Sequence, residues 1–202
     1  MRQPPSLIVV TCAAVLGLSG CSNTTITSID ATKASSSTSP VSGASSTTAT
    51  NTLPGPHPPP TDNNNGTSFD PCLAYTADEL KSWGVAPGSV EDQGVGDSVL
   101  RGCKWTGDGW VLQQLVVNQL IGDYFDSPSF PGARAITVDG LTAAQYRKPV
   151  DDMTICYIAL PSEKASVGTI VSVRDRKAKQ MIPDACTKAL EIASVTAKKL
   201  PK

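Results

Sequence analysis

Histidine is almost absent from this chain of 202 residues, which has a single one, His57. One histidine excludes sites with several His ligands, including the His-Glu-x-x-His zinc motif. The six cysteines contain no Cys-x-x-Cys pair, which excludes a zinc ribbon. The 17 Lys and Arg residues are balanced by 18 Asp and Glu residues, without the basic excess of a nucleic-acid-binding protein. We therefore expect no metal, no cofactor and no nucleic-acid partner.

Catalytic signatures are missing as well. The chain has no Gly-x-Ser-x-Gly elbow, no Ser-x-x-Lys motif and no phosphate-binding loop. His57 lies between two prolines and is expected to be inert. The adjacent acids Glu91-Asp92 and Asp151-Asp152 are conceivable catalytic pairs, but neighbours in a strand point to opposite faces and do not make an acid–base couple. The sequence therefore predicts a non-catalytic protein.

Residues 1–20 have the layout of a lipoprotein signal peptide. Arg2 precedes an apolar run from Leu7 to Leu18, which is too short to span a bilayer core of about 30 Å. The run ends in Leu-Ser-Gly-Cys, a pattern similar to the bacterial lipobox, with Cys21 as the acylated residue. Two or three acyl chains, such as diacylglycerol and palmitate, give stable anchoring. We expect a lipid-anchored protein on the extracytoplasmic face of the cell membrane; an ordinary secretory signal is the alternative.

The segment that follows lacks aromatic residues. Residues 22–68 contain 21 Ser or Thr and six Pro, and all ten aromatic residues of the chain come later. Such a segment cannot bury enough apolar surface to offset its conformational entropy. We expect residues 21–69 to be a disordered tether, open to O-glycosylation, followed by one globular domain over residues 70–202.

The predicted domain holds four cysteines, an even number that is typical of two disulfides in an exported protein. Three pairings are possible. We favour Cys72–Cys103 and Cys156–Cys186, because each closes a local loop within one half of the domain. A loop of about 30 residues contributes roughly 3–4 kcal/mol in the chain-entropy model. Free thiols or a redox pair are the alternative.

The hydrophobic pattern predicts an α+β fold. A capping box at Thr76–Glu79 starts a short N-terminal helix that ends at Gly84. Five strands follow, at residues 103–106, 110–119, 143–148, 153–160 and 167–174, with residues 86–101 and 122–135 irregular. The second strand is apolar on both parities and is expected to be covered on both faces. The last two strands should form an antiparallel hairpin.

The C-terminal helix begins near Pro183. Its expected apolar stripe consists of Cys186, Leu190, Ala193, Ala197 and Leu200. The predicted architecture is a mostly antiparallel sheet packed against this helix and the short N-terminal one, with two disulfides.

One aromatic cluster is a candidate binding site. Tyr124, Phe125 and Phe130 lie in the irregular segment near Arg134. If exposed, they form a binding lip for a partner or an apolar ligand; otherwise they cap the edge of the core. A basic run at residues 174–179 has two similar interpretations, an anionic headgroup contact or a solvated loop.

The motifs around the cysteines resemble a known family. Asp-Pro-Cys72-Leu precedes the capped helix, Gly-Cys103-Lys-Trp opens a strand, Cys156 lies within a strand, and Pro-Asp-Ala-Cys186 starts the last helix. Together they are similar to the actinobacterial, mycobacterial-type lipoproteins grouped as domain of unknown function 3558. The resemblance covers residues 69–202 and implies an envelope location and the same disulfides. The family implies no activity.

We therefore expect a non-catalytic binding or accessory module of the cell envelope, with the membrane, an envelope protein or a lipid as partner. The alternatives are a hydrolase that uses carboxylates on separate strands and a structural or antigenic coat protein.

Overall fold

A computed structural model describes residues 53–55, 57–94 and 98–201. The described residues fall within one compact unit, Ser45–Lys202. The predicted signal peptide, Cys21 and the first part of the predicted tether lie outside the described residues. No helix of the described part is both long and apolar enough to cross a membrane.

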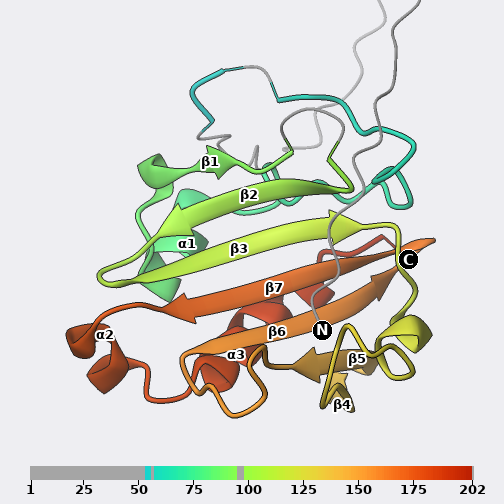
Figure 1. The fold of residues 1–202 in the computed structure, drawn as a ribbon. Coiled ribbons are helices and arrows are strands. Elements are labelled where there is room, and N and C mark those ends of the chain that lie inside the picture. Colours follow the sequence, from blue (N-terminus) through green and yellow to red (C-terminus); the bar gives the residue numbers. More distant parts are fainter. Residues whose placement is uncertain (1–52, 56, 95–97, 202) are drawn as a thin grey trace, which may run out of the picture. The chain divides into compact units, whose positions relative to one another are not determined.

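The described chain forms one antiparallel sheet of seven strands in the order β1-β2-β3-β7-β6-β5-β4 (Figure 1). The strands are β1 (Glu91–Asp92), β2 (Leu100–Thr106), β3 (Trp110–Val117), β4 (Arg134–Val138), β5 (Leu141–Tyr146), β6 (Ile155–Ser162) and β7 (Ala165–Val173). The helices are α1 (Ala77–Trp83), η1 (Pro87–Ser89), η2 (Ile121–Tyr124), α2 (Arg176–Met181) and α3 (Ala185–Ala197). The predicted α+β class is confirmed.

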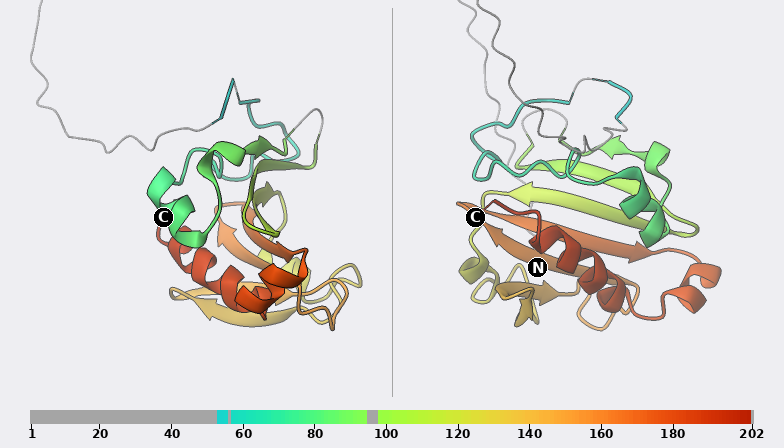
Figure 2. Two further views of the ribbon diagram at one scale, coloured as in Figure 1. Left: turned by 90° about the vertical axis from the view of Figure 1, so that its left-hand side faces the viewer. Right: turned by 180° about the vertical axis from the view of Figure 1, so that it is seen from behind.

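Helix α3 covers one face of the sheet, as the view from behind in Figure 2 shows. It contacts β6 and β7 through a stripe of small and branched side chains, Ala185, Ala189, Ile192 and Thr196, all of them buried. The alanines permit a close approach of the helix to the strands. The predicted stripe was wrong at Leu190, which is 41% exposed, because the buried face is rotated toward Ala189 and Ile192.

A buried polar network joins α3 to the sheet. Thr169 Oγ1 donates to Gln114 Oε1 at 3.2 Å, and Gln114 Nε2 donates to Thr196 Oγ1 at 3.4 Å. The Tyr75 hydroxyl lies 2.8 Å from the same Thr196 oxygen. Partners on three elements thereby satisfy polar groups that would be costly to bury alone.

Both predicted disulfides are confirmed. Cys72–Cys103 joins the segment before α1 to β2, with the Cα atoms 5.2 Å apart. Cys156–Cys186 joins β6 to the first turn of α3, with the Cα atoms 4.9 Å apart. The predicted capping box is also present, and Gly84 ends α1 in the left-handed conformation with φ 88°.

Several elements were missed where irregular structure or a loop was expected, among them β4 and α2. Strand β4 pairs with β5 through a two-residue turn at Asp139 and Gly140, which have φ values of 48° and 82° and so fit the turn type favoured in hairpins. Asp175 is the N-cap of α2, its carboxylate accepts from Ala178 N, and the helix buries Ala178. Residues 86–101 also contain the two-residue edge strand β1.

The ordered part of the domain begins before residue 70. We call residues 57–69 the N-terminal strap. Within it, Asn64 and Thr67 are buried, and the guanidinium of Arg101 donates to their carbonyl oxygens at 2.9 and 2.6 Å. These contacts are made by the main chain of the strap, so its poor apolar composition does not prevent docking. The expected disordered tether therefore does not describe residues 57–69.

Candidate functional site

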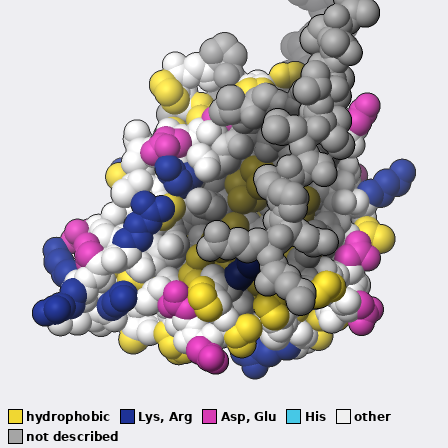
Figure 3. Space-filling model, in the orientation of Figure 1, with side chains coloured by type: hydrophobic (Ala, Val, Ile, Leu, Met, Phe, Trp, Pro, Cys, Tyr) yellow, Lys and Arg dark blue, Asp and Glu magenta, His cyan; other side chains and the backbone are white. Residues whose placement is uncertain are grey.

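The face of the sheet opposite α3, here called the open face, is the candidate site. No helix of the described residues covers its centre, and Figure 3 shows hydrophobic side chains on this face, with basic ones over the corner near α2. On β3, the side chains Leu115 and Val117 point to this face and are partly exposed, whereas Leu112 and Val116 are buried beneath α3. The expectation that this strand is covered on both faces was therefore wrong.

A row of small residues crosses the middle of the open face. The strand register places Gly102 opposite Leu115, Leu115 opposite Gly168, Gly168 opposite Ala159, and Ala159 opposite Ala144. Because four of these five residues have a methyl side chain or none, the row is lower than its neighbours. Its three middle residues, Leu115, Gly168 and Ala159, form the floor of a groove.

Aromatic rings form one wall of the groove. Tyr146 and Tyr157 are paired across β5 and β6 and stack with ring centroids 4.6 Å apart and an interplanar angle of 6°. Ile170 on β7 lies opposite Tyr157 and continues the same row onto the next strand. This row of large side chains runs parallel to the floor and stands above it.

The loop between β3 and β4, residues 118–133, closes the groove from the side of β5 and β6. Its Tyr124 ring lies 4.6 Å from Phe130, and Phe130 lies 5.1 Å from Tyr146. Tyr124 and Phe130 pack with Ala144 and Ala159, and the Tyr124 hydroxyl is 2.8 Å from Ser166 Oγ on β7. The loop is thereby fixed to the sheet, although η2 is its only helical turn in the described chain.

The space between these walls is a cavity of about 250 Å³. Its lining includes Leu115, Val117, Gly168, Ile170, Tyr146 and Tyr157, and no charged residue belongs to it. A concave, mostly apolar site with a few hydroxyl groups has the character of a small-ligand pocket.

The tyrosines of the cavity carry no charge at neutral pH. Burial raises the pKa of Tyr124, Tyr146 and Tyr157, and the hydrogen bond with Ser166 only partly offsets this for Tyr124. Their hydroxyls therefore remain neutral and able to donate or accept hydrogen bonds. The site therefore offers a ligand neutral hydrogen-bonding groups and no charged side chain.

The sequence predicted two of the four aromatic residues that line the cavity. Of the four predicted binding residues, Tyr124 and Phe130 line the cavity, whereas Phe125 is 37% exposed outside it. Arg134 lies on the edge strand β4, where it donates to Gln145 Oε1 at 3.1 Å and does not reach the cavity. The missed residues, Tyr146 and Tyr157, lie on strands whose mutual register the sequence does not reveal.

A second, larger cavity of about 540 Å³ lies on the other side of the molecule, between the β2–β3 turn and the start of α3. Trp83 and Trp110 form part of its lining, and the ammonium of Lys188 lies 5.9 Å from the Trp110 ring centroid. The charges at its rim are already paired: Lys188 with Glu191 at 3.0 Å, and Asp108 with Lys177 outside. The cavity therefore has no unpaired charge that would select a ligand.

His57 is not isolated, although it was expected to be inert. Its Nδ1 lies 2.5 Å from Asp92 Oδ2 and its Nε2 lies 3.2 Å from Asp70 Oδ2, so it ties the strap to β1. Among the described residues, His57, Cys72 and Asp92 are close enough together to suggest a metal site. The arrangement does not fit one, because Cys72 is in a disulfide and the two ring nitrogens engage separate carboxylates on opposite sides.

The adjacent acids have separate partners. Glu91 pairs with Lys104 at 2.7 Å, while its neighbour Asp92 contacts His57. Asp152 accepts hydrogen bonds from the backbone N and the hydroxyl of Thr154, at 2.8 and 2.6 Å. Glu91, Asp92 and Asp152 therefore each have a structural partner.

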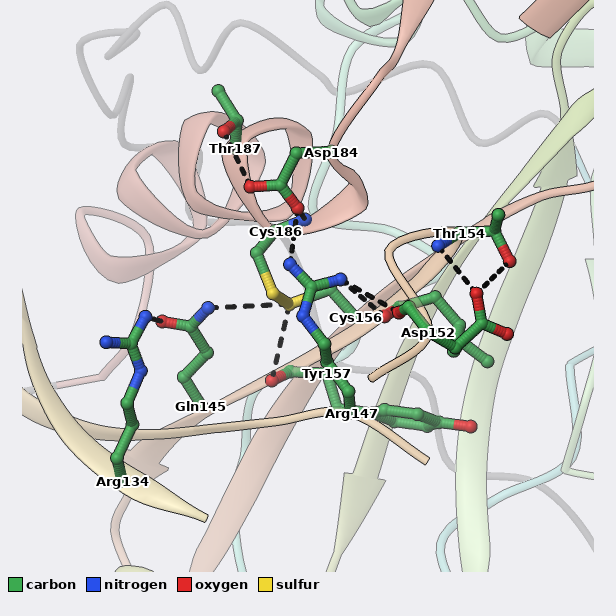
Figure 4. Close-up of polar contacts among 11 residues, drawn as sticks. Arg134, Gln145, Arg147, Asp152, Thr154, Cys156, Tyr157, Asp184, Cys186 and Thr187 are labelled. Atoms are coloured by element: carbon green, nitrogen blue, oxygen red, sulfur yellow. Dashed lines mark hydrogen bonds and ion pairs between the residues drawn. A yellow bond between two sulfur atoms is a disulfide. The ribbon is translucent and has the colours of Figure 1, made fainter. Parts of the chain in front are cut away.

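Near the disulfide Cys156–Cys186, Arg147 links the start of β6 to the start of α3 (Figure 4). Its guanidinium donates to the carbonyl oxygens of Asp152 and Ile155 at 3.0 and 3.2 Å and forms an ion pair with Asp184. Asp184 caps α3 by accepting from Cys186 N at 2.9 Å. Partial burial acts to raise the pKa of Asp184, but the hydrogen bonds from Arg147, Cys186 and Thr187 together lower it below its usual range.

Replacing Asp184 by asparagine should therefore destabilise the domain in a pH-dependent way. Asparagine keeps the helix cap but loses the charge that pairs with Arg147, at an expected cost of about 1–2 kcal/mol at pH 7. Because the folded-state pKa is lowered, the native carboxylate stabilises the fold above the ordinary Asp pKa of about 3.9 and loses that effect as the pH falls. Urea unfolding of both proteins at pH 7 and pH 3 tests this, and an equal difference at both pH values would contradict it.

The sequence matches a known protein family. The family model described as a protein of unknown function (DUF3558) matches residues 16–199. The chain belongs to this family. The match includes both disulfides and every residue of the groove named above, so the open face is part of the family domain. No curated protein and no solved structure matches the chain.

Proposed function

We propose that this DUF3558 protein is an exported, lipid-anchored, non-catalytic binding module of the cell envelope, and that it binds an apolar ligand in the open-face groove. The single observation that supports binding is the cavity of about 250 Å³, floored by small residues and walled by neutral aromatic and aliphatic side chains. Apolar area removed from water in such a groove supplies the binding energy.

Two features support the proposed location. The Leu-Ser-Gly-Cys pattern at Cys21 fits acylation, and paired cysteines are typical of an oxidising compartment outside the cytoplasm. The residues between Cys21 and the strap would give the domain reach above the membrane surface.

The anchor is tested by exchanging its one acylated residue. In its native host, the Cys21→Ala variant should leave the membrane fraction and lose the label from an alkyne analogue of palmitate, because the thiol is the acylation site. Labelling that persists in Cys21→Ala would contradict the proposed anchor.

The binding role is tested on the protein in its own membrane. We would extract a C-terminally tagged chain with mild detergent and identify co-purifying lipids and proteins by mass spectrometry, with Cys21→Ala as the anchor control. A Gly168→Leu variant fills the groove floor at a position where an added Cβ meets Leu115 O at 3.7 Å, an ordinary contact. We expect a stoichiometric ligand on the native chain and none on Gly168→Leu; an empty native protein would contradict the proposal.

A further inference from the structure

We infer that the occupant of the open-face groove is a single hydrocarbon chain of an uncharged lipid, which enters at the end of the sheet where β2 begins and β3 ends. This inference rests on the proposed function and names the class of ligand. Three observations support it: the size of the groove, the exposed apolar rim at one end and the sign of the charge around that rim.

The size limits what the groove can hold. With about 30 Å³ for each water-sized group, a cavity of about 250 Å³ holds roughly eight of them. That is a segment of one acyl chain and less than two chains side by side. Residues on five adjacent strands line it, from Leu100 on β2 to Tyr146 on β5, so the space extends across the sheet.

The rim at one end is apolar and exposed. Val99, Leu120 and Phe125 are 63%, 56% and 37% exposed. Each of them is adjacent in sequence to a residue that lines the cavity, Leu100, Gln119 or Tyr124. Large apolar side chains of this kind insert into the boundary between headgroups and acyl chains, where a lipid chain is available.

The charge around the rim selects against an anionic lipid. In the described loops at this end, residues 118–127 carry Asp123 and Asp126, and the β6–β7 turn carries Glu163 beside Lys164. These two segments together carry three acids and one base, and the β4–β5 turn at the same end adds Asp139, so a carboxylate or phosphate on the ligand would be repelled. Inside the groove, only neutral tyrosine hydroxyls and the Gln119 amide can meet polar atoms.

The first experiment measures equilibrium binding by the purified full chain in solution. Titration calorimetry with 1-decanoylglycerol should give one site per chain, and decanoate at pH 8 should bind at least about tenfold more weakly because of its charge. Gly168→Leu should weaken 1-decanoylglycerol binding at least about tenfold. The matched control is Ser172→Val, which adds apolar bulk on the same face of β7 but outside the cavity lining; it should leave the affinity unchanged.

The second experiment tests the entry route and does not use the Gly168→Leu variant. Transfer of a pyrene-labelled decanoylglycerol from phosphatidylcholine vesicles should slow at least about fivefold in a Leu120→Ser/Phe125→Ser variant, while its solution affinity stays native. Equal transfer rates would overturn entry at this rim.

The outcomes separate this inference from the function on which it rests. If Gly168→Leu loses a ligand that co-purifies from the membrane, but native protein does not bind 1-decanoylglycerol, the groove is a binding site and the hydrocarbon-chain inference is overturned. Tighter binding of decanoate than of 1-decanoylglycerol would overturn the uncharged class. If native protein co-purifies with nothing and binds neither probe, both proposals fall.

Discussion

Replacing Gly102 by alanine is expected to destabilise the domain severely, by roughly 3–5 kcal/mol. Gly102 has φ 143°, a conformation that side chains rarely adopt, and an added Cβ would lie 2.0 Å from Gln114 O on the neighbouring strand. That carbonyl belongs to the interior strand β3 and cannot move without disturbing the pairing of β3 with β2 and β7. Urea unfolding followed by circular dichroism measures the effect.

Gly168 is the matched control, because it flanks the same residue, Leu115, from the other side. Its Cβ would meet no atom closer than 3.7 Å, so Gly168→Ala should be neutral or stabilising by about 0.5–1 kcal/mol. If the two alanine variants unfold at similar urea concentrations, the conformational account of Gly102 is wrong. The contrast also shows why Gly168, and not Gly102, is the position at which to fill the groove.

Removing the second disulfide has the other large expected effect. The Cys156→Ala/Cys186→Ala variant should lose about 3–4 kcal/mol of stability, because the cross-link closes a loop with a sequence separation of 30 residues. It should also loosen the start of α3, which the disulfide ties to β6. The measurements are the urea midpoint and the hydrogen exchange of the amides in the first turns of α3.

The first disulfide provides the comparison. Its sequence separation is 31 residues, so Cys72→Ala/Cys103→Ala should cost nearly the same free energy while leaving exchange in α3 unchanged. A loss below about 1 kcal/mol in either variant would contradict the chain-entropy argument.

The local features of the fold could be predicted because their signals are local. The capping box from Thr76 to Glu79 and the terminal Gly84 determine α1 within nine residues. The disulfides followed from the separation of the cysteines into two halves of the domain. Strand β4 was missed because its burial is slight and Pro128 and Pro131 just before it suggested irregular structure.

The site could be predicted only in part, because its geometry depends on register between distant strands. Tyr124 and Phe130 stood out as an aromatic cluster in sequence. The floor formed by Gly168 and Ala159 has no such mark, since these residues meet only when β6 and β7 pair and β7 lies beside β3. Strand β3 is apolar on both faces because Leu112 and Val116 pack beneath α3 while Leu115 and Val117 line the groove, not because a second layer covers the open face.

The strap was missed for a different reason. Its docking uses backbone carbonyl groups, which every sequence supplies, and the decisive partner is the buried Arg101 on β2. Composition reports apolar side chains and therefore gives no sign of such contacts.

The positions of the two cross-links determine how the domain would respond to mechanical load. A pull on the chain upstream of the strap first meets the contacts of His57 and Arg101, and then Cys72, where the disulfide carries the force directly to β2. A pull on the C-terminus unwinds α3 only as far as Cys186, where the force passes to β6. Tension from either end therefore reaches strands inside the sheet, and while both bonds are intact the groove between them lies in the part of the molecule that resists extension.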